Sequence, residues 1–228
     1  MPQRDAWERE YRNPQLISLG DKPKSDFLRF LRFLRKKEGL PTTELTILDL
    51  GAGAGRNANY LAELGNNVIG LEISQAAREL AETRAKEKNV RVEYRAGDIG
   101  ASHPFESEYF DLIIDILASN SLNEKEREVY LKEVVRVLKP GGHFFVQALS
   151  KDGDKNAKKL LEEYPGPEKD TYVMPELGLI ERVFSEEDFR NLYGSYFEIQ
   201  QLTKKKNYAL FKGQRYKRNY WIAYLKKV

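Results

Sequence analysis

The 228-residue chain contains no cysteine and only two histidines. The missing cysteine excludes disulfides, thiolate metal ligands and a cysteine nucleophile. His103 and His143 stand apart from any cluster with metal-ligand spacing, so no metal site is expected. No apolar run approaches the ~20 residues that a membrane-spanning helix needs, and residues 1–5 lack the apolar character of a signal peptide. We therefore expect a cytoplasmic protein, monomeric or dimeric, that does not associate with membranes.

Acidic residues are missing from the last part of the chain. Residues 199–228 contain nine of the 38 Lys/Arg and none of the 35 Asp/Glu, which leaves 29 basic and 35 acidic residues in the remainder. Such a segment can attract an anionic substrate or a nucleic acid. Lysines also protect strand edges against unwanted pairing, and the sequence leaves both interpretations open.

Apolar segments alternate with helical patterns after residue 46. This order predicts an α/β fold with a largely parallel, Rossmann-like doubly wound sheet and right-handed crossovers. Tyr109–Ile116 is the most apolar segment and is typical of a central strand buried on both faces. The five predicted strands of this part are residues 46–50, 68–71, 90–94, 109–116 and 143–149.

The flanking parts of the chain follow other patterns. Residues 24–37 predict an amphipathic helix, and residues 1–23 are irregular or weakly helical. Residues 150–183, rich in Pro and Gly, predict a long loop that is either functional or mobile. We divide the chain into a helical lid or extension at 1–40 and a main domain at 41–228, with 150–183 as an insertion on the substrate side. The expected last elements are a helix beginning after Ser185 and strands at 196–202 and 220–225.

Residues 46–56, TILDLGAGAGR, carry the strongest functional pattern. A buried strand runs into a turn with three alternate glycines, and the turn opens a helix. Glycine tolerates positive φ and lets a ligand approach the backbone. Asp49 precedes the turn, and Glu72 ends the next strand, where a carboxylate suits both ribose hydroxyls of a nucleoside. The pattern differs from Gly-x-Gly-x-x-Gly, and Asp49 would repel a pyrophosphate, so S-adenosylmethionine is favoured over a dinucleotide.

Residues 48–55 resemble motif I of the class I S-adenosylmethionine-dependent methyltransferases. Residues 56–62 are similar to the version in small bacterial methyltransferases of the tellurite-resistance and thiopurine type. Residues 97–99, 110–115 and 137–142 match later motifs in order and spacing. The resemblance implies a seven-stranded, mostly parallel sheet with an antiparallel last strand, and S-adenosylmethionine as cofactor, with S-adenosylhomocysteine as product.

The resemblance also implies the cofactor site. Glu72 corresponds to the ribose ligand, Asp98 to the contact with the adenine amino group, and Asp115 either to a residue that orients methionine or acceptor, or to a cap of the next segment. Tyr11 and Trp7 are candidates for a lid. The candidate catalytic residues are Asp115 and Tyr11. The expected cofactor-binding residues are Asp49, Gly51, Ala52, Gly53, Gly55, Arg56, Asn57, Glu72, Ile73, Gly97, Asp98, Ile99 and Asp115.

The methyl acceptor has no such signature. Without cysteine the covalent route to C5-methylated pyrimidines is excluded, and the stretch at 115–118 lacks the Asp/Asn-Pro-Pro-Tyr signature of amino-nitrogen methylation. We expect transfer to an O, N or S nucleophile of a small molecule. The alternatives are an RNA or protein substrate bound by the basic segment, and a non-catalytic module that binds S-adenosylmethionine. Candidate acceptor residues are Tyr164, Tyr172, Met174, Arg182, Arg215, Tyr216, Arg218 and Tyr220.

Overall fold

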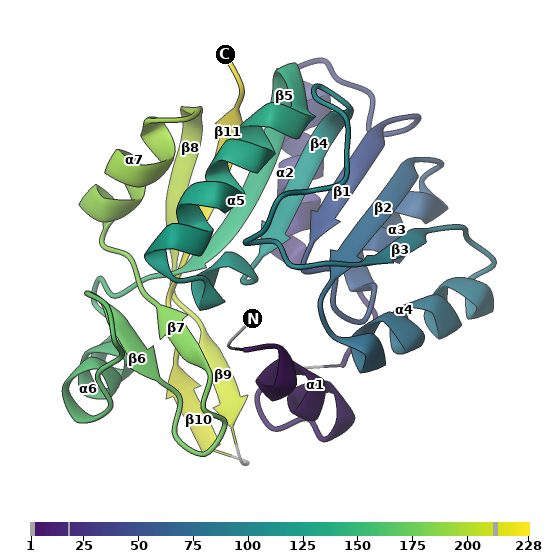
Figure 1. The fold of residues 1–228 in the computed structure, drawn as a ribbon. Helices are drawn as coiled ribbons and strands as arrows, with labels where there is room; N and C mark the ends of the chain where they lie inside the picture. Colours follow the sequence, from purple (N-terminus) through teal and green to yellow (C-terminus); the bar gives the residue numbers. More distant parts are fainter. Residues whose placement is uncertain (1–2, 18, 212–213) are drawn as a thin grey trace.

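The computed structural model describes residues 3–17, 19–211 and 214–228. Its centre is a seven-stranded sheet in the order β3-β2-β1-β4-β5-β11-β8 (Figure 1). Strands β1 to β5 are parallel, and β11 runs antiparallel to both β5 and β8. The expected sheet with an antiparallel last strand is confirmed. The strands are β1 (Thr46–Leu50), β2 (Asn67–Glu72), β3 (Glu93–Ala96), β4 (Phe110–Ile116), β5 (Leu138–Leu149), β8 (Glu198–Lys205) and β11 (Tyr220–Lys226).

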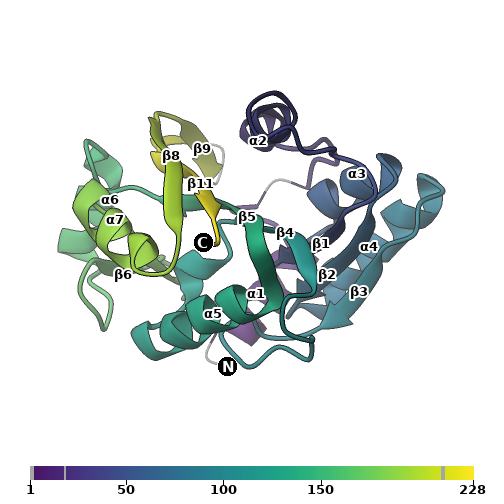
Figure 2. The ribbon, with the colours of Figure 1, turned by 90° about the horizontal axis from the view of Figure 1, so that it is seen from above.

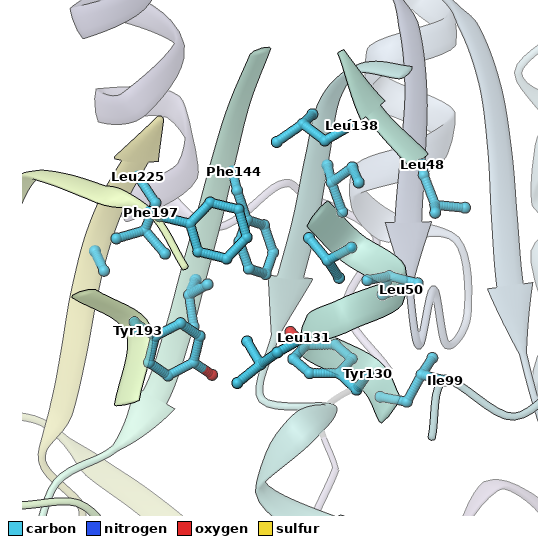
Figure 3. Close-up of a cluster of buried hydrophobic side chains, with 14 of the residues drawn as sticks. Leu48, Leu50, Ile99, Tyr130, Leu131, Leu138, Phe144, Tyr193, Phe197 and Leu225 are labelled. Atoms are coloured by element: carbon cyan, nitrogen blue, oxygen red, sulfur yellow. The ribbon is translucent and has the colours of Figure 1, made fainter. Parts of the chain in front are cut away.

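Helices cover both faces of the sheet. Successive side chains of a strand point to opposite faces, so Ile113 packs under α5 and α7 while Leu112 and Ile114 pack in the cluster of α2 and α3. Figure 2 shows α2 and α5 on opposite sides of the sheet, and Figure 3 shows the cluster on the α5 side. Burial on both faces explains why the β4 sequence is almost entirely apolar. The helices are α2 (Ser25–Lys37), α3 (Arg56–Glu63), α4 (Gln75–Glu87), α5 (Glu124–Val137) and α7 (Glu186–Gly194).

The first forty residues take two different positions. Helix α2 belongs to the core, because its Phe27 and Phe30 rings pack on Phe145 of β5 with centroid distances of 5.6 and 5.1 Å. Helix α1 (Arg4–Arg12) instead lies beyond the carboxyl ends of β1 and β2 (Figure 1). Of these two helices, α1 is therefore the one placed where a lid would lie.

The expectation of a long loop at 150–183 is wrong in part. This segment forms α6 (Lys155–Glu163) and an antiparallel pair of β6 (Thr171–Val173) and β7 (Ile180–Arg182). Asp154 caps α6 by accepting hydrogen bonds from the backbone N–H groups of Asn156 and Ala157. The basic segment adds a second hairpin, β9 (Tyr208–Phe211) and β10 (Gln214–Lys217). Both hairpins lie at the same end of the sheet as α1 (Figure 1).

Candidate active site

The glycine turn joins β1 to α3 with three backbone conformations that L side chains rarely adopt. The φ angles of Gly51, Gly53 and Gly55 are +67°, +54° and +75°. A Cβ at Gly53 would lie 2.3 Å from the Tyr11 hydroxyl, and one at Gly51 would lie 2.4 Å from the Ala118 Cβ. Glycine is therefore required at both positions by φ and by the close approach of neighbouring segments.

Gly55 serves a different purpose. A Cβ there would lie 2.3 Å from the Tyr94 hydroxyl and 2.9 Å from the Ala81 Cβ. The residue is not part of the cavity lining described below. Gly55 thus allows the turn to pack against α4 and β3, whereas its expected contact with the cofactor finds no support in this position.

A cavity of about 690 Å³ lies over the turn, at the carboxyl ends of the parallel strands. This is the position and size expected of a ligand site in such a sheet. The structure brings most of the predicted site residues together here. The predicted residues that line the cavity are Tyr11, Asp49, Gly51, Ala52, Gly53, Arg56, Asn57, Glu72, Ile73, Gly97, Asp98 and Ile99.

Two buried carboxyl groups, those of Asp49 and Glu72, line the cavity. Asp49 is 2% exposed, and its Oδ2 has no hydrogen-bond partner among the described residues. Burial, followed by the charges of Asp115 and Glu72, raises the pKa of Asp49 to about 8. Burial also raises the pKa of Glu72. A cationic ligand would compensate both the charge repulsion and the missing partner.

Glu72 also connects the glycine turn to α4. Its Oε2 accepts a hydrogen bond from the Gly53 N–H and its Oε1 accepts one from the Ser74 N–H, both at 2.8 Å. Ser74 in turn caps α4 through the Ala77 N–H, as its sequence position predicts. Substituting Glu72 would therefore disturb the turn as well as any ribose contact.

Asp98 and Ile99 follow β3 at the cavity wall. Asp98 Oδ1 accepts a hydrogen bond of 2.9 Å from the Gly100 N–H, which fixes the carboxylate in the turn. Ile99 is 8% exposed and lines the cavity beside it. This position is compatible with a polar and an apolar contact to adenine, and the contact remains a prediction.

Asp115 lies apart from the cavity lining. It is fully buried, and its Oδ1 accepts a hydrogen bond of 2.9 Å from the Ala118 N–H. Its Oδ2 accepts hydrogen bonds from the Ser119 N–H at 3.2 Å and the Tyr130 hydroxyl at 2.5 Å. These contacts stabilise the short 3₁₀ helix at Ser119–Ser121 and support the capping alternative over a direct role at the cofactor.

Helix α1 covers the cavity and is held at its middle and just before its first residue. The Glu8 Oε2 accepts hydrogen bonds from the Ser74 hydroxyl at 2.7 Å and from the Ala76 N–H at 3.2 Å, at the start of α4. Before the helix, the Gln3 side chain accepts a 2.7 Å hydrogen bond from the Ile180 N–H of β7. Sequence reasoning singled out Trp7 and Tyr11 but missed these two anchors, because no local pattern connects them to α4 or β7.

The Tyr11 hydroxyl approaches Gly53 of the glycine turn and lies in the field of the two buried carboxylates. Burial, and then the charges of Glu72 and Asp49, hold the pKa of Tyr11 well above its usual range. The phenol therefore stays protonated at neutral pH. It can donate a hydrogen bond in the cavity but is a poor proton acceptor.

A buried ion pair lies farther along the cavity wall. Arg218 Nη2 donates to Glu181 Oε1, and the Tyr172 hydroxyl donates to Glu181 Oε2 at 2.8 Å. The side chains of Arg218 and Glu181 are 14% and 4% exposed. Of the expected acceptor residues, Arg215, Arg218 and Tyr220 line the main cavity, and Tyr164, Tyr172, Met174 and Tyr216 line a second cavity of about 310 Å³ that Arg218 also borders.

Arg182 lines neither cavity. It lies 3.7 Å from a Glu124 carboxylate oxygen and places its guanidinium over the Phe184 ring. Within the described ranges no group of three His, Cys, Asp or Glu side chains is placed to hold a metal ion. No helix in that same part of the chain is long and apolar enough to span a membrane.

Comparison with known proteins identifies the class of this fold and site. Residues 48–146 match the family model of a methyltransferase domain. An uncharacterized methyltransferase of Schizosaccharomyces pombe is 30% identical over 104 residues, which cover 46% of this chain and 71% of the relative. The chain belongs to the class I S-adenosylmethionine-dependent methyltransferases.

Two bacterial relatives match this chain over less than half of their own length. A ubiquinone biosynthesis O-methyltransferase of Chelativorans sp. is 30% identical over 111 residues, and a 2-heptyl-1-hydroxyquinolin-4(1H)-one methyltransferase of Mycobacteroides abscessus is 32% identical over 106 residues. The matches cover 49% and 46% of this chain, and they span only 43% and 46% of the two relatives.

Solved structures share the fold. A methyltransferase of Methanosarcina mazei has a TM-score of 0.74 at 24% identity, with 91% of this chain and 99% of that chain covered. TehB of Haemophilus influenzae has a TM-score of 0.67 at 18% identity, with 99% and 67% covered. The resemblance to the tellurite-resistance type is thus present in the fold.

The cavity fits S-adenosylmethionine, the cofactor of this family. The cofactor carries a sulfonium and an ammonium cation, and the buried Asp49 with its unpartnered oxygen lies in the same cavity as Glu72. Gly51 and Gly53 of the turn line the cavity without a side chain. Charge and shape therefore agree with the assignment.

Proposed function

We propose that this chain transfers the methyl group of S-adenosylmethionine to an O, N or S nucleophile of a small molecule. The observation that carries the proposal is the composition of the cavity wall. Residues of α1, Glu181 of β7 and residues 207–209, 215, 218 and 220 line the cavity together with the cofactor motifs. The acceptor must therefore reach a cavity of about 690 Å³ that also holds the cofactor, which suits a small molecule better than a polymer. The bacterial relatives, one of ubiquinone biosynthesis and one that acts on a hydroxyquinolinone, also support a small-molecule acceptor.

The chain contributes mainly position and environment. The cofactor supplies an electrophilic methyl group and a good leaving group. The protein must hold the nucleophile in line with that methyl and exclude water. We propose that Glu72 and Asp98 bind the nucleoside, that Asp49 faces the cationic part, and that Tyr11 donates a hydrogen bond from the lid.

The basic C-terminal segment is largely occupied by contacts within the protein. Lys205 pairs with Asp26, and Lys226 pairs with Glu38 at 3.0 Å. Lys217 donates to the Gly153 carbonyl at 2.7 Å. These contacts weaken the case for an RNA substrate. Strong salt dependence of RNA binding would restore that alternative.

The experiment measures cofactor binding and methyl transfer separately. Calorimetry with S-adenosylmethionine is expected to show binding that Glu72→Ala weakens at least about tenfold, since a buried hydrogen-bonded carboxylate is lost. Glu87→Ala, at an exposed position near the end of α4, is the control and should leave affinity unchanged. Radiolabelled cofactor is then incubated with fractionated cell extract, and label is expected in small molecules.

Three results would contradict the proposal. Unchanged affinity in Glu72→Ala would remove the assigned cofactor site. Label that enters only RNA or protein would exclude a small-molecule acceptor. Tight cofactor binding with no transfer to any fraction would favour the non-catalytic module.

A further inference from the structure

The second cavity adjoins the acceptor end of the main one. It has a volume of about 310 Å³ and lies among α6, β6, the end of β5 and β10. Leu16, Ala209 and Arg218 line both cavities. The two cavities therefore share part of one wall, and a molecule bound beside the cofactor would have to pass these three residues to reach the side cavity.

Buried apolar side chains form one part of the wall of this side cavity, beside the polar groups of Ser150, Asp154 and Asn156. Leu149, Met174 and Val183 are 2%, 5% and 1% exposed. Leu160 of α6 adds another apolar side chain, while Lys159 and Glu163, one turn apart on the same helix, are exposed at the rim. The apolar part of this wall suits an apolar group of a ligand.

A polar network stands at the boundary between the two spaces. Glu181 lines the main cavity, Tyr172 lines the side cavity, and Arg218 lines both. Glu181 is neutralised by Arg218 and receives the Tyr172 hydroxyl. The Arg218 Nε is buried without a hydrogen-bond partner among the described residues. At this boundary the Arg218 Nε–H is thus left as a hydrogen-bond donor, and the charges of Glu181 and Arg218 compensate each other.

We propose that the side cavity holds an apolar tail of the methyl acceptor, whose polar, nucleophile-bearing head lies in the main cavity near Arg218. The acceptor class is an amphiphile with a small oxygen-bearing head and an aliphatic chain. This inference rests on the proposed function, since it extends the acceptor site of the same reaction.

The test uses 4-n-alkylcatechols with methyl, propyl, pentyl and heptyl chains. Their binding to the full chain, saturated with S-adenosylhomocysteine, is measured by calorimetry, so that no turnover is needed. Affinity is expected to rise about two- to fourfold per methylene while the chain fills the side cavity, as burial of one methylene predicts.

Two matched variants test whether the dependence of affinity on chain length arises in the side cavity. Leu160→Trp puts a large ring on the cavity wall and should abolish the dependence on chain length while leaving the affinity for S-adenosylhomocysteine unchanged. Leu161→Trp, at the neighbouring position of α6 outside the cavity lining, should retain it. Circular dichroism and cofactor affinity report whether each variant is folded.

The outcomes separate this inference from the proposed function. Affinity that is independent of chain length, no binding by any member of the series, or the same length dependence in Leu160→Trp would overturn the tail site. Methylation of the short catechols with length-independent binding would retain the methyltransferase function and reject the tail. Length-dependent binding that Leu160→Trp removes would support the tail site even where transfer fails.

Discussion

A single methyl group at Gly53 should break the contact between the glycine turn and the lid. The Cβ of Gly53→Ala would lie 2.3 Å from the Tyr11 hydroxyl and 3.4 Å from its Cζ. The first distance is far below van der Waals contact, whereas the second is tolerable. The residue also has a φ of +54°, which strains any L side chain.

The two effects can be given separate magnitudes. The left-handed backbone costs about 1–2 kcal/mol for a residue other than glycine. Displacing the buried Tyr11 ring is overpacking, which costs about 1–3 kcal/mol. Gly53→Ala should therefore lower the free energy of unfolding by about 2–5 kcal/mol, from the sum of these two effects.

A double-mutant cycle isolates the clash. Tyr11→Phe removes the hydroxyl oxygen, so Gly53→Ala in that background should cost only the backbone strain of about 1–2 kcal/mol. Gly39→Ala is the control, because Gly39 has a φ of +66° and no atom within 4 Å of the added Cβ. The free energies come from urea denaturation without cofactor, and calorimetry with S-adenosylmethionine follows on the same variants.

Two results of this cycle would contradict a clash between Gly53→Ala and Tyr11. If Gly53→Ala costs the same with Tyr11 and with Phe at position 11, the lid does not press on the turn in the free protein. If Gly39→Ala costs as much as Gly53→Ala, backbone strain alone accounts for the loss. Either result would refute the close contact between the Tyr11 hydroxyl of α1 and Gly53 of the turn.

Three further predictions test other parts of the site. Because burial raises the pKa of Asp49 to about 8 from 3.8, the folded state keeps a proton that the unfolded chain releases, and stability should fall from about pH 4 to about pH 8. Binding of the cationic cofactor should then release a proton, seen in calorimetry as a dependence on buffer ionisation enthalpy; heats that are independent of the buffer would refute this. Arg218→Met leaves the Glu181 carboxylate buried without its cation and should cost about 3–5 kcal/mol, most of which the added Glu181→Gln should restore in thermal denaturation; an undiminished loss in the double variant would count against the pair. Glu8→Ala releases α1 from α4 and should speed S-adenosylmethionine dissociation several-fold in stopped-flow measurements, at a stability cost of about 0.5–2 kcal/mol, as for a lost helix cap; an unchanged rate would show that α1 does not limit exit.

The cofactor site could be predicted from the sequence because its residues lie at or just after the ends of the parallel strands. Asp49, Gly53 and Glu72 follow or end consecutive parallel strands, and such ends meet at one edge of the sheet by topology alone. The apolar β4 segment and the alternation of strands and helices likewise report burial and connectivity directly. The class of fold, the cofactor and most of the cavity lining followed from these patterns.

Side-chain direction was decided by the tertiary structure. Gly55 shares the pattern of the other two glycines, yet it faces Tyr94 and Ala81 behind the turn. Asp115 stands at a strand end like Asp49, yet Tyr130 and the backbone at 118–119 take its oxygens. The position of a residue in a sequence motif therefore does not tell whether its side chain faces the ligand or packs against the protein behind the motif.

The lid and the acceptor cavities also depended on the folded structure. Gln3 meets Ile180, Glu8 meets Ser74, and the side cavity joins residue 16 to α6 and β10. These contacts connect segments far apart in sequence, and no period or motif marks them beforehand. The sequence by itself thus determined which cofactor the sheet binds, while only long-range packing decided what covers it and what shape of acceptor the remaining space fits.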